Sequence, residues 1–425
     1  MINRTYQYRL RSGPFGKLNE LASKVNFVWN CVNQTYEQSV RRYFAGAVSK
    51  GGFISYNDFT SYLPTTDGFG FTKGASIEVG LPQTMINRIA KQYADAIKVA
   101  NRKKLRRKLR WRKTKTEFEE CSIPFRIDSC SFTQIQDSKT GKFYGTISVR
   151  CNRDILKFRT FKDRKTTGTP KEIIFKRDKF GRWKANVVCV DIPVAPAKNN
   201  KNIGVDVGGV KNVYCSNGYS EDAINPERLL RKRRMLKRSI SRKEEAIREK
   251  HNIKRIKGKE SVRLIKARKK LQKLEYKIAR IRADHTHKTT SNIAKEVGSG
   301  FVFVEKLKIK NMTRSGKGTF ENPGKNVKAK SGLNKSFLNA APYETKMQLK
   351  YKTEVNCGEL IEVSAYNTSQ RCPKCKDTPK SGELSHRRSR DYFECRKCEY
   401  AAHADYIGAQ NILDNGLQII EKGKT

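Results

Sequence analysis

The stretch from Tyr366 to Leu413 reads YNTSQRCPKC and, after a linker, FECRKCEYAAHADYIGAQNIL, and it decides how the end of the chain folds. Nineteen residues separate its two Cys-x-x-Cys pairs, which are Cys372 with Cys375 and Cys395 with Cys398. Each pair places two sulfur atoms on one tight turn, and two such turns complete a tetrahedral shell around Zn²⁺. The spacing predicts a structural zinc ribbon; the alternatives are two unrelated pairs or redox-active dithiols.

Three acidic residues stand in comparable places along the chain. Asp206 lies within the apolar strand expected over 203–210, Glu305 ends the apolar run FVFV, and Asp405 opens a helix that follows the ribbon. A single buried acid is usually a helix cap or an ion-pair partner, but three in such contexts indicate catalysis. Carboxylates are preferred ligands of Mg²⁺, and two such ions can drive in-line hydrolysis of a phosphodiester. A strand with an acid followed by a glycine-containing hairpin is also how RNase H-like domains begin.

The formal net charge of the chain is +49 over 425 residues. A charge of this size repels itself in a compact protein, so we expect a polyanionic partner, namely nucleic acid. A membrane surface is the alternative, but no run reaches the ~20 apolar residues that span a bilayer. The first residues lack the apolar core of a signal peptide, and the seven cysteines outside the ribbon are scattered, which suits a reducing cytoplasm.

The first half of the chain predicts strands, then helices, then more strands. A strand is expected over 5–10, a helix from the spacing of Leu18, Leu21, Val25, Val28 and Val32, and a second helix after Pro82. The second helix runs into the basic stretch 101–115, and period-two strands follow over 131–191. A charge run is usually a solvated face, but its density predicts contacts with nucleic-acid phosphates. The candidates there are Lys103, Lys104, Arg106, Arg107, Arg110 and Arg112.

The second half predicts an interrupted α/β domain. A basic helical hairpin is expected over 225–285, because apolar residues recur at heptad-like spacing on both sides of Gly258. Lys232, Arg233 and Arg234 on this hairpin are further candidates for nucleic-acid contact. We expect a short separate helix ending at Val297, a central strand over 301–305, a mobile loop over 306–335, a helix over 343–357 and a strand over 359–363.

These residues resemble the TnpB family, the RNA-guided nucleases of insertion sequences related to type V CRISPR effectors. The matching motifs are GVDVGGVKN around Asp206, FVFVEKLKIKNM around Glu305, NTSQRCPKC with FECRKC, and HADYIGAQNI around Asp405. The resemblance is strong after Lys201 and only organisational before it. Two departures are Glu399, where many relatives have glycine, and Ile407-Gly408, where many have Asn-Ala; neither replaces a metal ligand.

The resemblance implies a multidomain α+β protein that holds a guide RNA and cleaves target DNA beside a short flanking motif. It implies a RuvC nuclease with structural Zn²⁺ and two catalytic Mg²⁺ ions, in which Asp206, Glu305 and Asp405 are the catalytic acids. The implied domains are a wedge strand over 1–14, a helical recognition domain over 15–120, a wedge β-barrel over 121–198, an RNase H-like RuvC domain over 199–364, a zinc ribbon over 365–400 that contacts target nucleic acid, and the RuvC end over 401–425.

Other functions stay open at this point. A miniature type V CRISPR effector, a guided DNA-binding repressor and a DNA transposase share parts of this pattern. A plain RNA-binding zinc protein would account for the charge and the ribbon but not for the acids. Double-stranded and single-stranded target DNA are the expected substrates of a prokaryotic cytoplasmic protein that we expect to be a monomer. The sequence leaves open the guide, the flanking motif, a dimer, collateral single-strand cleavage, and a transposon or CRISPR origin.

Overall fold

The chain divides into two compact units, residues 1–193 and 194–425, each of which has its own sheet in the computed structural model. The structure describes residues 2–45, 79–102, 109–112, 121–151, 154–161, 163–178, 180–192, 197–208, 211–256, 258–319 and 321–423. Across these ranges, no helix combines the length and the apolar character that a membrane crossing requires.

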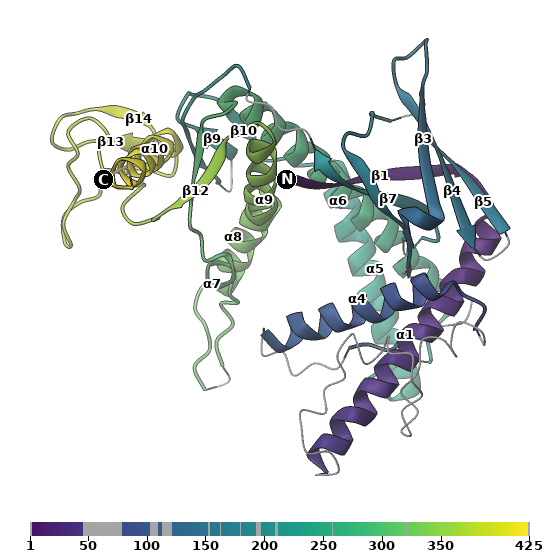
Figure 1. The fold of residues 1–425 in the computed structure, drawn as a ribbon. Helices are drawn as coiled ribbons and strands as arrows, with labels where there is room; N and C mark the ends of the chain where they lie inside the picture. Colours follow the sequence, from purple (N-terminus) through teal and green to yellow (C-terminus); the bar gives the residue numbers. More distant parts are fainter. Residues whose placement is uncertain are drawn as a thin grey trace. The chain divides into compact units, whose positions relative to one another are not determined.

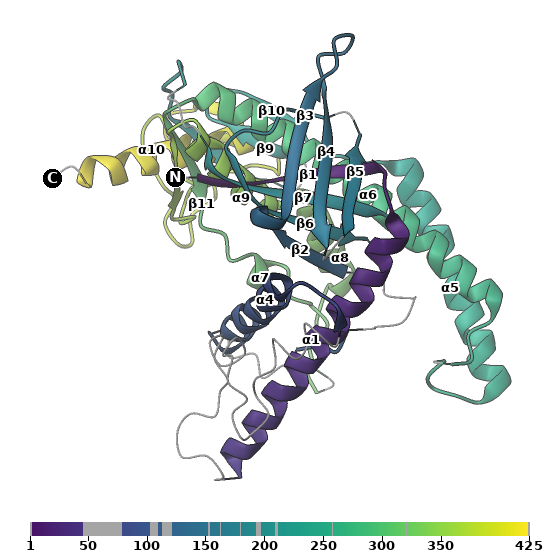
Figure 2. The same ribbon diagram turned by 45° about the vertical axis from the view of Figure 1, so that its right-hand side comes forward.

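The first unit is built on a curled seven-stranded sheet in the order β2-β6-β7-β1-β5-β4-β3 (Figures 1 and 2). Its strands are β1 (Ile2–Ser12), β2 (Cys121–Arg126), β3 (Cys130–Gln136), β4 (Phe143–Cys151), β5 (Asp154–Thr160), β6 (Thr169–Arg177) and β7 (Trp183–Ile192). Strand β1 pairs with β7 along most of its length and with β5 at its C-terminal end, where the register shifts between Leu10 and Ser12. In the described residues no ladder joins the edge strands β2 and β3, so the hydrogen-bonded order does not close into the expected barrel.

Two helices pack on this sheet, α1 (Phe15–Phe44) and α4 (Gln83–Arg102). Leu18, Val25 and Val32 of α1 are buried, which confirms the helical spacing predicted from the sequence. Helix α4 is also fixed to β6 by charge, because Arg88 donates Nε and Nη2 to the two carboxylate oxygens of Glu172 at 2.6 and 2.7 Å. Glu172 is buried, and this two-point pairing compensates the cost of burying its charge. A short 3₁₀ helix, Ile127–Ser129, joins β2 to β3.

The second unit contains a five-stranded sheet in the order β10-β9-β8-β11-β12. Its strands are β8 (Ile203–Asp206), β9 (Lys211–Cys215), β10 (Ser220–Asp222), β11 (Phe301–Glu305) and β12 (Glu359–Val363). Strands β8, β11 and β12 are parallel, and β9 and β10 are antiparallel to their neighbours. The central strand β11 is buried through Val302, Phe303 and Val304, as its continuous apolar run predicts.

The helices of this unit are α5 (Glu227–His251), α6 (Val262–Val297), α7 (Ile309–Met312), α8 (Val327–Asn339), α9 (Pro342–Val355) and α10 (Ala404–Lys422). Helices α5 and α6 form the predicted hairpin, with Ile240 packed near Leu264 and Leu230 near Ile278. A small ladder of β13 (Tyr392–Glu394) and β14 (Ala401–His403) precedes α10.

Three further expectations, all in the second unit, were wrong in detail. The short separate helix before Val297 is the end of α6, because residues 283–296 contain no glycine or proline to interrupt that helix. The segment 306–335 is not only a loop, since it holds α7 and most of α8. Asp206 is the last residue of β8 instead of lying mid-strand, because the strand stops before the glycine-containing turn.

Candidate active site and metal centre

Asp206 and Glu305 end two neighbouring parallel strands at the same edge of the sheet. Val205 of β8 is in register with Val304 of β11, so the next residue of each strand is one of the two acids. Polar groups at the carboxyl ends of adjacent parallel strands lie beside each other, which is where open α/β sheets place their sites.

Asp405 reaches the same edge from the first turn of α10. The helix can approach β8 closely because Gly204 has no side chain: a Cβ there would lie 2.2 Å from the carbonyl oxygen of Ala409. Gly408, one turn after the acid, faces Asp206, and a Cβ on it would lie 2.9 Å from Oδ2 of that aspartate. Three segments far apart in sequence therefore bring the three predicted acids to one place.

The negative charges of the three acids lie close together, which favours the binding of a cation. Burial and the nearby carboxylates of Glu305 and Asp405 raise the pKa of Asp206 to about 8. Burial also raises the pKa of Glu305, while the hydrogen bond from Thr368 opposes that rise. Crowded, partly desolvated carboxylates of this kind are the donor set that hard divalent cations such as Mg²⁺ take, so the residues present fit that ion.

Arg387 brings a positive charge to the acids from the linker of the ribbon. Its Nη2 lies 3.6 Å from Oδ1 of Asp405, and its charge lowers the pKa of Asp206 against the larger effects that raise it. The linker is held over the start of α10 because Ala404 donates its backbone N–H to the carbonyl of Asp391. A guanidinium there can hold an anionic phosphate oxygen beside the acids.

The loop before the ribbon supports Glu305 and α10 together. Thr368 is buried and donates its hydroxyl to Oε1 of Glu305. The amide nitrogen of Asn411 on α10 donates to the carbonyl oxygens of Thr368 and Arg371, both at 2.7 Å. Sequence reasoning missed Thr368, Asn411 and Arg387; the NTSQ motif before the first cysteine pair and the RRSR run in the linker were the available signals.

The four predicted cysteines come together in a cluster that can hold a metal ion. The sulfur of Cys372 lies 3.7 Å from that of Cys398, and that of Cys375 lies 3.5 Å from that of Cys395. These spacings fit a tetrahedron of thiolates with Zn–S distances of about 2.3 Å. A backbone N–H from Tyr400 lowers the pKa of Cys398 to about 7, which favours the thiolate that a metal needs.

The four sulfur atoms all lie within 4.8 Å of one another, close enough to share one metal ion. Buried His386 braces the ribbon: its Nε2 lies 3.1 Å from Oδ2 of Asp377, and its Nδ1 accepts the backbone N–H of Arg396 at 3.2 Å. These contacts assign the proton to Nε2, and the sequence analysis had not singled this residue out.

The predicted nucleic-acid contacts stay predictions, and the structure places only some of the residues named for them. Lys103, Lys104, Arg106 and Arg107 lie outside the described residues. Lys232 and Arg234 are exposed on α5, whereas Arg233 lies 3.4 Å from Glu275 of α6 and helps join the hairpin. Arg110 and Arg112 line a pocket of the first unit.

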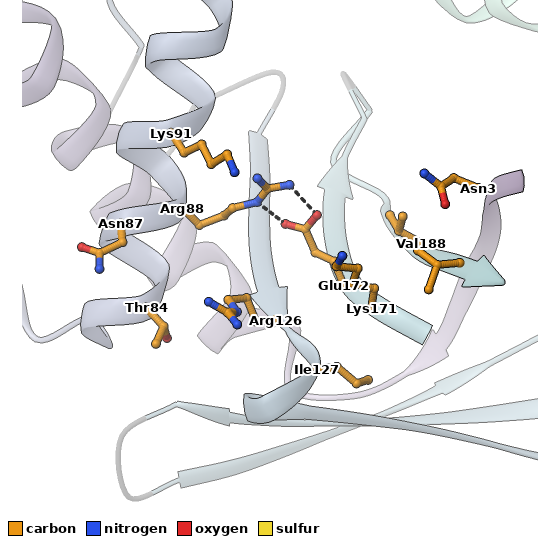
Figure 3. Close-up of a pocket in the computed structure, with 11 residues that line it drawn as sticks. Asn3, Thr84, Asn87, Arg88, Lys91, Arg126, Ile127, Lys171, Glu172 and Val188 are labelled. Carbon is orange, nitrogen blue, oxygen red and sulfur yellow. Dashed lines mark hydrogen bonds and ion pairs between the residues drawn. The ribbon is translucent and has the colours of Figure 1, made fainter. Parts of the chain in front are cut away.

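A second pocket of the first unit, about 550 Å³, lies between α4 and the sheet (Figure 3). The ion pair of Arg88 and Glu172 crosses it, and Lys91, Arg126 and Lys171 add positive charge around that pair. Thr84 and Asn87 contribute polar groups from α4. The lining suits an anion with hydrogen-bonding groups near it, as a nucleic-acid strand presents.

Two family models match parts of the chain. Residues 187–316 match the OrfB_IS605 model, described as "Probable transposase", and residues 343–412 match the Cas12f1-like TNB domain. The first match contains Asp206 and Glu305, and the second contains Asp405 and the four cysteines.

Curated relatives agree with these models. The chain is 34% identical over 265 residues to the "Putative RNA-guided DNA endonuclease InsQ" of Escherichia coli strain K12, covering 61% of this chain and 60% of that protein. It is 27% identical to the "Putative RNA-guided DNA endonuclease" of Streptomyces pristinaespiralis, covering 58% and 53%. The chain thus spans somewhat more than half the length of these relatives.

Solved structures with similar chain traces are distant. A Cas12f1–sgRNA–target DNA complex has a TM-score of 0.32 at 17% identity, covering 98% of this chain and 100% of that one. The mini-RNA-guided endonuclease CRISPR-Cas_phi3 has a TM-score of 0.43 at 11% identity, covering 98% and 92%. The family models and the curated relatives confirm that this chain resembles the TnpB proteins of insertion sequences and, over residues 343–412, the TNB domain of Cas12f1-like proteins.

Proposed function

We propose that this protein is an RNA-guided DNA endonuclease that hydrolyses a DNA phosphodiester at Asp206, Glu305 and Asp405. The observation that carries the proposal is the meeting of these acids at one sheet edge, with the pKa of Asp206 raised to about 8 by crowding and burial. The mixed sheet of the second unit, in the order β10-β9-β8-β11-β12 with β8, β11 and β12 parallel, supports an RNase H-like RuvC domain. The names of the curated relatives support the same activity.

The three acids would hold two Mg²⁺ ions in this proposal. When bound there, the metal supplies an activated water and stabilises the leaving 3′ oxygen. Thr368 keeps Glu305 oriented, so that one carboxylate oxygen is engaged and the other is left for the metal. Arg387, whose Nη2 lies beside Asp405, would hold an anionic oxygen of the scissile phosphate next to the acids.

The zinc ribbon holds the linker and the first turn of α10 in place. Its buried cysteines pack with Phe393, Ala404 and Ile407 in one small core, so the ribbon and Asp405 move together. In the first unit, the helices and curled sheet would grip guide RNA and the DNA that flanks the target. The pocket between α4 and the sheet is our candidate for contact with a backbone phosphate of the flanking DNA, because Lys91, Arg126 and Lys171 add positive charge around the ion pair of Arg88 and Glu172.

The test begins with the nucleic acid that copurifies with the full chain. Sequencing that RNA identifies the guide segment, and a DNA carrying the matching target with randomised flanks then serves as substrate. Guided cleavage in Mg²⁺ that Asp206→Ala abolishes would support the proposal. A chain that binds the guided target without cutting it in Mg²⁺ would instead be a repressor.

A DNA transposase is the second candidate, since the matched family model is described as a probable transposase. It predicts strand transfer of transposon ends without RNA. Joining of labelled transposon-end DNA by RNA-free protein would favour it over the guided nuclease.

A further inference from the structure

A pocket of about 620 Å³ in the first unit combines an exposed indole with clustered positive charge. It is lined by residues 109–112, by Trp29 of α1 and by residues on or next to β1, β2, β6 and β7. Its volume falls within the range of about 300–1,000 Å³ usual for ligand sites. Neither the acids nor the zinc ribbon accounts for this pocket.

The segment that carries the indole is fixed to α1. The side-chain amide of Asn30 donates to the carbonyl oxygen of Arg112 and accepts its backbone N–H, both at 2.7 Å. The guanidinium of Arg112 also lies 3.5 Å from the ring centre of Trp29, which is buried in the core. These three contacts fix the backbone of Arg112, the residue next to Trp111, so the indole of Trp111 starts from a defined position.

Trp111 is 55% exposed although it lines the pocket. A large indole left in water loses the free energy that its burial would contribute, about 25 cal/mol per Å² of apolar area. An indole face is also the surface on which unstacked bases bind, with little preference for base identity. The exposure therefore favours a flat aromatic ligand.

The charge of the lining selects an anionic ligand. Arg110, Arg112, Lys176, Arg177 and Lys184 line the pocket, and Asp178 is the one acid among its lining residues. That acid is already engaged, because Arg182 donates to it through its backbone N–H at 3.0 Å and its Nε at 2.9 Å. The residues that line the pocket therefore carry a net positive charge, since five cations stand against one acid that Arg182 already pairs.

We propose that this pocket binds one unstacked nucleotide, with its base on Trp111 and its phosphate against Arg110, Lys176 and Lys184. The chemistry is the same for a flipped-out nucleotide of a guide RNA and for one of a DNA single strand. The assignment deepens the proposed guided nuclease and rests on it for the source of the nucleic acid. Binding itself does not require that the acids cut DNA.

The experiment uses the full chain freed of nucleic acid on heparin at high salt. Binding of fluorescent single-stranded RNA and DNA of one sequence is measured for wild type, Trp111→Leu and Trp111→Phe. Loss of one stacked base weakens binding by about 5- to 150-fold for the leucine variant. The phenylalanine variant keeps a π-face and loses much less. Phe161→Leu, which removes an exposed ring outside the pocket, is the matched control and leaves binding unchanged.

Salt dependence separates the two parts of the pocket. Trp111→Leu lowers affinity without changing the slope of log K against log salt, whereas Lys176→Ala reduces that slope by about 1. If Trp111→Leu loses more affinity for RNA than for DNA, the bound nucleotide comes from the guide RNA. If it loses more affinity for DNA, the nucleotide comes from a DNA strand. Three results would overturn the assignment. The leucine and phenylalanine variants could lose equal affinity, or the leucine variant could bind like wild type. Polyglutamate of equal charge could also displace both oligonucleotides.

The same variants distinguish this inference from the proposed nuclease. If oligonucleotide binding by an Asp206→Ala protein still depends on Trp111, the nucleotide pocket is supported even where no cleavage is found. If the protein cleaves guided DNA and neither binding nor cleavage depends on Trp111, the nuclease is supported and the pocket is rejected.

Discussion

Thr368 donates its hydroxyl to Oε1 of Glu305 at 2.5 Å, and its own carbonyl oxygen accepts from Asn411 at 2.7 Å. One residue thus links the end of β11 to the helix that carries Asp405. The hydrogen bond opposes the rise in the pKa of Glu305 that burial causes, so it favours the ionised carboxylate that a metal requires.

The first prediction is that Thr368→Val lowers the affinity of the acids for Mg²⁺ more than it lowers the stability of the fold. A hydrogen bond to a charged acceptor contributes about 1.5–3 kcal/mol, so guided cleavage at limiting Mg²⁺ should fall by roughly 10- to 100-fold. Titration of Mg²⁺ should show a higher half-saturating concentration, and excess metal should recover much of the rate. Thr368→Ser keeps the hydroxyl and should behave like wild type; equal defects in both variants would show that the hydroxyl is not the cause.

The second prediction concerns pH. The pKa of Asp206 is raised from near 3.9 to about 8, so between these values the folded state holds a proton that the unfolded state has lost. The free energy of unfolding therefore falls as pH rises from about 4 to about 8, and this contribution is level above that. Asp206→Asn removes the contribution, so in Mg²⁺-free buffer it should raise the melting temperature more at pH 8 than at pH 5.5. A gain independent of pH would contradict the assigned pKa.

The third prediction concerns the zinc site. Cys395→Ser removes one of four thiolates, so the purified protein should contain less than one zinc per chain by elemental analysis. Because the ribbon cysteines share a core with Ala404 and Ile407, cleavage should fall as well. Cys357→Ser changes an exposed thiol outside the ribbon and should retain both zinc and activity. Wild-type protein without zinc would end this assignment.

The fourth prediction tests the turn after the second cysteine pair. Glu399 has φ +54°, and the equivalent Lys376 after the first pair has φ +60°. A side chain in this left-handed region costs about 1–2 kcal/mol, a cost that glycine avoids. Glu399→Gly should therefore raise the free energy of unfolding by about 1 kcal/mol. Glu399→Ala keeps the Cβ and should show no gain in the same thermal unfolding experiment.

The sequence predicted those parts of the molecule that rest on local chemistry. The spacing of the four cysteines is a local constraint, and the apolar run before Glu305 is long enough to mark a central strand. The spacing of Leu18, Val25 and Val32 likewise indicated the buried face of α1. Each signal needs only neighbours in sequence.

Features that depend on packing could not be read in this way. Thr368 is an ordinary polar residue until the fold brings it to Glu305, and Arg387 is one of many basic residues until the linker folds over α10. The continuous α6 was missed because the pattern changes where the helix leaves the hairpin and packs Ile293 and Val297 on the sheet. A change in the apolar pattern along one continuous helix therefore looked like the start of a second helix.

The most direct test of the central claim is cleavage by Asp206→Ala. With the RNA that copurifies and its matching DNA, the variant should bind the target with wild-type affinity but cut it at a rate reduced by at least about 10³-fold, since the acid holds the metal and not the guide. Asp284→Ala, an exposed acid paired with Lys288 on α6, should cut normally. Wild-type cleavage by Asp206→Ala would contradict the account.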